Sequence, residues 1–199
     1  ISMLARGSSC GLSLSSAKEP VSFFYQKRFF VHRNQHAVER NRQLVALAMG
    51  YKINNKTNYG LQPFHNDNFT MDIVNNPNAV LLPSSSNKKK AWVDEYWIRS
   101  GNLLNSLGIP PVIVSGDLVE LEKAKELSKN IRGSFVLDLS PLKTITSILL
   151  KTRIVIGLDT GLTHLAAALG KPTIGIYSNT DPDKTGIYGV EHGLNLGGI

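Results

Sequence analysis

From residue 79 onward, the chain alternates short apolar runs with longer stretches of helical composition. The apolar runs lie at 79–82, 111–114, 135–137, 154–156 and 173–177. The segments between them predict helices near 94–107, 119–130, 142–152 and 161–169. Short apolar strands separated by helices are typical of a parallel sheet that is covered on both faces. The carboxyl ends of such strands share one edge of the sheet, where ligands bind.

The turn after the fourth apolar run is the strongest candidate for a binding site. Asp159 and Thr160 stand where a helix N-cap belongs, and Gly161 allows a ligand to approach the backbone. The free amides and dipole of a helix start favour an anion, most often a phosphate. The chain contains no G-x-G-x-x-G motif, and residues 170–173 do not form a P-loop. An ordinary strand-turn-helix unit, in which His164 packs or faces solvent, explains the turn alone equally well.

A second polar loop, Ser-Asn-Thr-Asp-Pro at 178–182, follows the next strand and reaches the same edge of the sheet. Together, the two segments resemble the carboxyl-terminal domain of the ADP-heptose:lipopolysaccharide heptosyltransferases. In that family, D-T-G-[LMT]-[ST]-H, followed by a strand and a T-D-P loop, lines the sugar-nucleotide pocket. The resemblance implies an α/β fold of the GT-B glycosyltransferase type, with two Rossmann-like domains and the donor bound between them.

The residues after the first strand also match this family, which has small hydroxyl residues there, then a lysine and a nearby tryptophan. The resemblance makes Ser85 and Ser86 donor-binding residues and places Lys90 beside the phosphates and sugar of the donor. An ammonium group at that place would stabilise the departing diphosphate. The alternative is a solvated basic loop, which we prefer for the two preceding lysines.

The resemblance assigns further donor contacts at the starts of two helices. Glu120, four positions after Gly116, would bind ribose or sugar hydroxyls, although an acid in a first helical turn can equally well stabilise the dipole. Asp138 differs from the residues expected beside the adenine. Lys90 and Asp159 are the two catalytic candidates. After the fourth strand, the resemblance assigns the sugar hydroxyls of the donor to Asp159, with His164 beside it. It assigns the diphosphate to the backbone amides of Thr160, Gly161 and Leu162.

The amino-terminal segment resembles type I members of the family, which add the first heptose. Lys18 lies in a Lys-Glu-Pro segment that borders the acceptor cleft in those enzymes, so it is a candidate for binding the anionic acceptor, Kdo-bearing lipid A. The residues 35–49 predict a helix ended by Gly50, and we expect His36 in it to be structural. The expected division is an acceptor domain at 1–60, a linker at 61–78 and an ADP-heptose domain at 79–199.

Composition narrows the choice of partners. There are 22 Lys and Arg residues against 15 Asp and Glu residues, giving a net charge of +7 that favours anionic partners. Because the chain has no basic stripe interleaved with aromatic residues, we do not expect nucleic acid. The single cysteine suits a reducing compartment and excludes both an intramolecular disulfide and a cysteine-based metal site. No apolar run has the length of roughly 20 residues that a membrane span needs.

The resemblance implies an inverting heptosyltransferase that transfers heptose from ADP-heptose to Kdo-lipid A without a metal or other cofactor. We expect a monomer in the cytoplasm, peripheral to the inner membrane. We also expect a fragment cut at both ends that is inactive alone, because the family's general base, an aspartate in a glycine-rich loop, lies further toward the amino terminus. The alternatives are a type II or III heptosyltransferase and a non-catalytic nucleotide-sugar-binding module.

Overall fold

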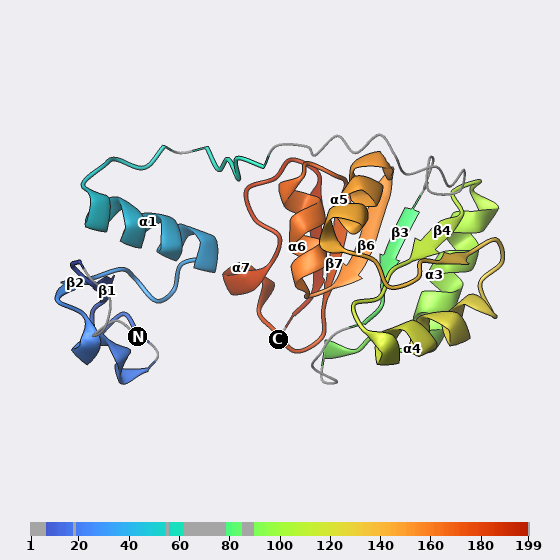
Figure 1. Ribbon diagram of the computed structural model, residues 1–199, viewed down its shortest axis with the longest axis horizontal. Helices are drawn as coiled ribbons and strands as arrows, with labels where there is room; N and C mark the ends of the chain where they lie inside the picture. Colours follow the sequence, from blue (N-terminus) through green and yellow to red (C-terminus); the bar gives the residue numbers. More distant parts are fainter. Residues whose placement is uncertain (1–6, 18, 55, 62–78, 85–89, 199) are drawn as a thin grey trace.

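The computed structural model describes residues 7–17, 19–54, 56–61, 79–84 and 90–198 (Figure 1). The carboxyl-terminal part alternates strands and helices in the predicted manner. Its elements are β3 (Ala79–Leu82), α3 (Asp94–Ser106), β4 (Pro111–Ile113), α4 (Leu118–Ser128), β5 (Phe135–Val136), α5 (Leu142–Lys151), β6 (Ile154–Leu158), α6 (Gly161–Ala168), β7 (Thr173–Tyr177), α7 (Pro182–Thr185) and β8 (Gly193–Gly197).

The strands from β3 to β8 form one parallel sheet in the order β5-β4-β3-β6-β7-β8. The five strands predicted from the apolar runs are confirmed, and the α/β fold with a parallel sheet is confirmed with them. Strand β8, which pairs along β7 at the edge of the sheet, was not predicted. Its sequence, Gly-Leu-Asn-Leu-Gly, carries only two apolar residues between glycines, so it lacks the continuous apolar run of a central strand.

The chain reverses its direction of travel across the sheet between β3 and β6. From β3 the chain proceeds outward through β4 to β5, and it then returns to β6 and continues through β7 to β8. Strands β3 and β6 are therefore neighbours, with Leu81 paired to Ile156, although a long stretch of sequence separates them. In open α/β sheets, ligands bind outside the carboxyl ends of the strands at such a reversal of strand order.

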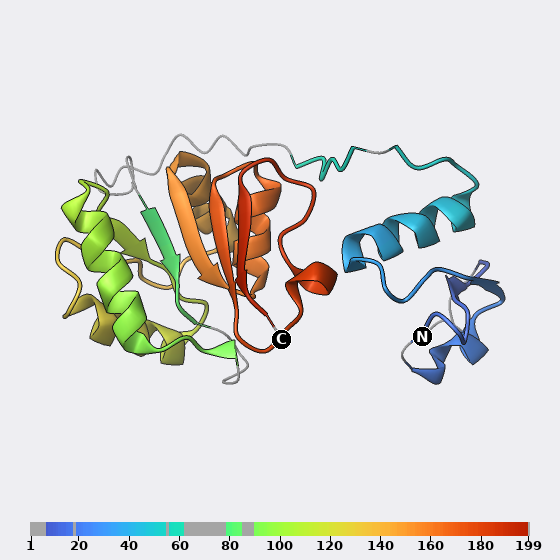
Figure 2. The ribbon, with the colours of Figure 1, turned by 180° about the vertical axis from the view of Figure 1, so that it is seen from behind.

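Two apolar clusters fill the space between the sheet and its helices. Helices α5 and α6 cover one face, where Val80, Val155 and Ile148 are buried (Figure 1). Helix α3 covers the other face near β3 and β4, and the fully buried Trp97 anchors it there (Figure 2). Because both sides of the central strands are covered, these strands are apolar throughout. The packed core thereby holds the carboxyl ends of the strands, which the site residues follow, in fixed positions.

A glycine in β6 allows α6 to approach the sheet closely. A Cβ added at Gly157 would lie 2.2 Å from Thr163 Oγ1 and 3.0 Å from the Cβ of Leu82. The Thr163 hydroxyl is held in that place, because it donates a hydrogen bond of 2.6 Å to the Leu158 carbonyl. The missing side chain at Gly157 therefore leaves room for Thr163 of α6 to pack against the sheet.

We expect Gly157→Ala to destabilise the fold by about 1–3 kcal/mol, because the extra methyl group overpacks a buried contact that has no room to give. Urea unfolding monitored by circular dichroism measures this change. Gly161→Ala is the matched control, because a Cβ at Gly161 would meet no atom within 4 Å. Equal stability of the two variants would contradict the packing argument.

The amino-terminal part contains β1 (Cys10–Leu12), the 3-10 helix η1 (Pro20–Phe24), β2 (Lys27–Phe29) and α1 (Ala37–Met49). Strands β1 and β2 pair in parallel, and neither was predicted. The predicted helix is confirmed as α1, and Gly50 ends it in the left-handed conformation with φ of 74°. His36 is the N-cap of this helix, and its Nδ1 accepts a hydrogen bond from the Val38 amide.

The two parts meet where α1 begins. His36 Nε2 lies 3.1 Å from the Gly186 carbonyl oxygen, and its ring stacks on Tyr188 with a centroid distance of 4.3 Å. Tyr59 adds a second bond across the contact, donating its hydroxyl proton to the Tyr188 carbonyl over 2.7 Å. His36 therefore has structural contacts, as expected from the sequence, and the segment after α7 is the surface that α1 touches.

Candidate functional site

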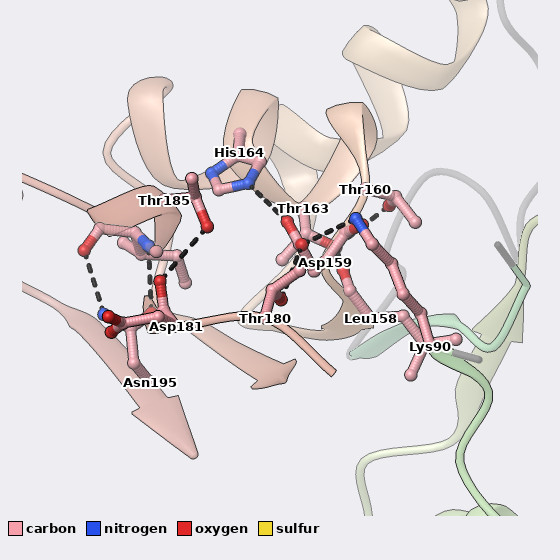
Figure 3. Close-up of polar contacts among 12 residues, drawn as sticks. Lys90, Leu158, Asp159, Thr160, Thr163, His164, Thr180, Asp181, Thr185 and Asn195 are labelled. Atoms are coloured by element: carbon pink, nitrogen blue, oxygen red, sulfur yellow. Dashed lines mark hydrogen bonds and ion pairs between the residues drawn. The ribbon is translucent and has the colours of Figure 1, made fainter. Parts of the chain in front are cut away.

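An ion pair joins the segments that follow β3 and β6, at the reversal of strand order. Lys90 Nζ lies 2.7 Å from Asp159 Oδ2 and 3.3 Å from the Asp159 backbone oxygen (Figure 3). The Asp159 side chain is 8% exposed and the Lys90 side chain is 23% exposed. The two residues selected from the sequence as catalytic candidates are thus in direct contact.

The Asp159 carboxylate has two further partners. Thr180, in the loop after β7, donates its hydroxyl proton to Asp159 Oδ2 over 2.9 Å. His164, on the first turns of α6, places Nε2 3.2 Å from Asp159 Oδ1. Figure 3 shows the three partners converging on this carboxylate from three different segments. The structure therefore brings together Lys90, Asp159 and His164, as the resemblance predicted, and adds Thr180.

The partners keep the Asp159 carboxylate ionised. Burial by itself raises the pKa of this carboxyl, but the hydrogen bonds from Lys90, Thr180 and His164 outweigh burial and hold the pKa below its ordinary value. The same negative charge acts on Tyr177, whose pKa is raised to about 12, mainly by its own burial. Asp159 is consequently an anion with fixed orientation, suited to accept hydrogen bonds from hydroxyl groups.

The sequence placed Asp159 and Thr160 at the N-cap of the helix, and the structure gives that position to Thr160. Asp159 does not cap the helix, because Thr160 is its N-cap residue and the carboxylate of Asp159 points to Lys90, Thr180 and His164. The Thr160 side chain makes no capping bond either; its hydroxyl lies 3.3 Å from Thr163 Oγ1. Asp159 lies one residue before the N-cap, and both of its carboxylate oxygens are engaged by Lys90, Thr180 and His164. The amides that begin α6 therefore have no side-chain cap and can receive an anion.

Glu120 lies at the start of α4, one strand further along the same edge. Its Oε2 accepts a hydrogen bond of 2.7 Å from the Gly116 amide, while its own amide donates to Asp117 Oδ1 over 2.8 Å. Asp117 is the N-cap of α4, so the arrangement is a variant of the capping box in which Glu120 bonds the residue before the N-cap. The structure thus gives Glu120 the helix-stabilising contact considered as its alternative role, and a contact with ribose stays a prediction.

Two hydroxyls at this edge were not selected from the sequence. Ser84 follows β3 and Ser115 follows β4, and both side-chain oxygens are buried without a hydrogen bond to the described residues. Their place directly after predicted strands was the available signal. The predicted donor residues Ser85 and Ser86 and the predicted acceptor residue Lys18 lie outside the described residues.

A cavity of about 190 Å³ lies on the other side of His164, where the two parts of the chain meet. His36 and Tyr59 line it from the amino-terminal part, and Ile187 and Tyr188 line it from the segment after α7. The imidazole of His164 therefore contacts Asp159 with one nitrogen and also lines this cavity. His164 is thus the residue that the Asp159 contacts and this cavity have in common.

Within the described ranges, no group of three or more His, Cys, Asp or Glu side chains is arranged to hold a metal ion. In the same residues, no helix is both long enough and apolar enough to span a membrane.

Comparisons with known proteins agree with this geometry. The family model for glycosyltransferase family 9 (heptosyltransferase) matches residues 1–197. Lipopolysaccharide heptosyltransferase 1 of Escherichia coli K12 is 34% identical over 191 residues, which are 95% of this chain and 59% of that protein.

Two solved structures of E. coli heptosyltransferase WaaC resemble the fold. The structure with ADP-2-deoxy-2-fluoro heptose superposes with a TM-score of 0.81 at 30% identity, over 98% of this chain and 60% of that one. The structure with ADP gives a TM-score of 0.78 at 30% identity, over 93% of this chain and 57% of that one. The chain thus spans about 60% of the length of these E. coli relatives.

Proposed function

This chain belongs to glycosyltransferase family 9, the heptosyltransferases, and we propose that it carries the donor site of an enzyme that transfers heptose from ADP-heptose to Kdo-lipid A. The observation that carries this proposal is the Lys90–Asp159 pair at 2.7 Å beside the uncapped start of α6. The site contains a positive side chain and free helix amides, which suit the diphosphate half of a nucleotide sugar. It also contains a carboxylate held in place, which suits the sugar half. The diphosphate needs positive charge, and the sugar needs hydrogen-bond acceptors.

The proposed division of roles follows from charge. The amides of Thr160, Gly161 and Leu162 begin α6 and would bind the diphosphate, because a helix start favours an anion. Lys90 would turn from Asp159 toward the diphosphate and stabilise the charge that develops as ADP departs. Asp159, together with His164, would accept hydrogen bonds from the heptose hydroxyls. Glu120, Ser85 and Ser86 complete the proposed donor contacts.

We further propose the order of domains predicted from the sequence, with residues 1–60 on the acceptor side, 61–78 as a connection and 79–199 as the ADP-heptose domain. In support, β3 to β8 form one sheet of their own, while β1, β2 and α1 lie outside it. The two parts touch through His36 and Tyr188, next to the cavity lined by His164. An acceptor bound by Lys18 and its neighbours would then approach the sugar end of the donor.

The type I assignment rests on the relatives, since the curated proteins from E. coli and Pseudomonas aeruginosa, both 34% identical, are named lipopolysaccharide heptosyltransferase 1. A type I enzyme acts on Kdo-lipid A, which is anchored in a membrane. We therefore propose that the protein works as a monomer on the cytoplasmic side of the inner membrane, and its net charge of +7 would favour an anionic lipid surface.

We expect this chain to bind ADP more tightly than UDP, and adenosine at least about 10-fold more weakly than ADP. Loss of the diphosphate removes charge-assisted hydrogen bonds from Lys90 and the α6 amides, each worth about 1.5–3 kcal/mol. Isothermal titration calorimetry with the three ligands measures the order. UDP binding as tight as ADP binding would refute an adenine-linked donor, and equal binding of adenosine and ADP would refute the diphosphate site.

A further inference from the structure

Thr180 is the one partner of Asp159 that has no role in the scheme above. Its hydroxyl donates to Asp159 Oδ2 over 2.9 Å, and Lys90 Nζ contacts the same oxygen at 2.7 Å (Figure 3). The other oxygen, Oδ1, faces His164. Two donors from different loops thus share Oδ2.

The two donors on Oδ2 differ in their freedom to move. Lys90 is a long side chain that is partly exposed to solvent, so its ammonium can turn away from Asp159 when a diphosphate arrives. Thr180 has a single side-chain torsion and cannot follow a ligand over several ångströms. After Lys90 turns to the diphosphate, Thr180 is the donor that remains on Oδ2.

The segment that carries Thr180 is held at both of its ends. It leaves β7 after Tyr177, which is 1% exposed, and Asp181 immediately caps α7 by accepting a bond from the Asp183 amide. Further along, the side chain of Asn195 in β8 makes two hydrogen bonds to the backbone of Ile187. Its Oδ1 accepts from the Ile187 amide over 2.9 Å, and its Nδ2 donates to the Ile187 carbonyl over 3.0 Å. These hydrogen bonds hold the backbone on both sides of Thr180, and so they fix the position of its hydroxyl.

We propose that Thr180 is a positioning residue for Asp159: its hydroxyl holds Oδ2 in place when Lys90 leaves it for the diphosphate, so that the carboxylate stays aimed at the heptose hydroxyls. This proposal rests on the donor site proposed above. It adds a residue that acts through Asp159 and does not itself touch the reacting atoms. The segment that carries Thr180 continues to Gly186 and Tyr188, which contact His36 of α1. The position of Thr180 therefore also depends on the contact between the two parts of the chain.

The effect on protonation follows from the groups that face Asp159, which are Lys90, His164 and the neutral Tyr177. Removing the Thr180 hydroxyl takes away one of the bonds that hold the Asp159 pKa below its ordinary value, so this pKa rises. Because the carboxylate is the active form, activity is lost as pH falls through the pKa of Asp159. The acid limb of the pH profile of kcat/KM should therefore move to higher pH.

The test compares Thr180→Val, which keeps the shape and loses the hydroxyl, with Thr180→Ser, which keeps the hydroxyl. Both are assayed for heptose transfer in the complete gene product that carries this chain. We expect Thr180→Val to lower kcat about 10-fold or more, with ADP affinity unchanged, and Thr180→Ser to restore most of the rate. Thr185→Val is the matched control, because the Thr185 hydroxyl donates to the Asp181 carbonyl and not to Asp159.

Carbon-13 NMR titration of the Asp159 carboxyl gives a second readout that does not depend on turnover. In Thr180→Val the titration midpoint should rise relative to wild type and to Thr180→Ser. If Thr180→Val does not fold, Thr180→Ala takes its place in both measurements. Wild-type kcat and pH profile in the hydroxyl-free variant, or equal midpoints, would overturn the positioning role. A wild-type protein that transfers no heptose would instead refute the proposed function, while the midpoints would still report whether Thr180 holds Asp159.

Discussion

Replacing Asp159 with asparagine should lower heptose transfer on the order of 10³-fold while ADP binds with nearly wild-type affinity. The amide keeps the size of the side chain but loses the negative charge that accepts strong hydrogen bonds from sugar hydroxyls. Two lost charge-assisted bonds of about 1.5–3 kcal/mol each correspond to a rate loss of this size. Steady-state kinetics with ADP-heptose and calorimetry with ADP separate the sugar contact from the nucleotide contact.

Asp183→Asn is the matched control for this variant. Asp183 is an exposed acid on α7, and its charge is removed near the site without touching the Lys90 contact. We expect its kinetics to stay at the wild-type level. An Asp159→Asn enzyme with normal transfer but a lowered melting temperature would mean that the carboxylate only supports the fold. That result would remove the main reason for placing the sugar at this end of the site.

Lys90→Ala should reduce turnover on the order of 10²-fold, because the ammonium stabilises charge that develops on the departing diphosphate. Folding stability should change by about 1 kcal/mol or less, since Lys90 is partly solvated and Asp159 keeps Thr180 and His164 as partners. Thermal unfolding and kcat are measured on the same preparation. The expected result is therefore a large change in kcat with little change in melting temperature.

Lys123→Ala is the control for a general effect of charge. Lys123 also pairs with an aspartate, Asp94, at 2.9 Å, but it lies on α4, away from the contacts of Asp159. Its loss should leave turnover unchanged. Unchanged kinetics in Lys90→Ala would show that the pair with Asp159 does not contribute to catalysis. Lys88 and Lys89 would then be the next candidates.

The sheet could be predicted from the sequence because its central strands are apolar on both faces. The runs at β3, β4, β6 and β7 stand out for this reason, as does the helix that Gly50 ends. The edge strand β8 and the short β1 and β2 could not be found in this way. β1 and β2 have only three residues each, and β8 has only two apolar residues set between glycines, so the pattern is too short to stand out before pairing with a neighbour is seen.

The site could be predicted in part. Polar residues after parallel strands meet at one edge, so Lys90 and Asp159 were both expected at one donor site, although no contact between them was predicted. The particular partners depend on strand order, because β3 and β6 must be neighbours for Lys90 to reach Asp159. No sequence pattern encodes the direction in which the Thr180 hydroxyl points. The same holds for the Asp159 side chain, which bonds other side chains and does not cap α6.

The transfer reaction itself tests the account most directly. The complete gene product is incubated with ADP-heptose and Kdo-lipid A, and the lipid and nucleotide products are followed by mass spectrometry. We expect the lipid to gain one heptose and one ADP to be released for each transfer. Tight binding of ADP-heptose without any transfer would indicate a nucleotide-sugar-binding module. Transfer only to an acceptor that already carries heptose would contradict the assignment to the first addition.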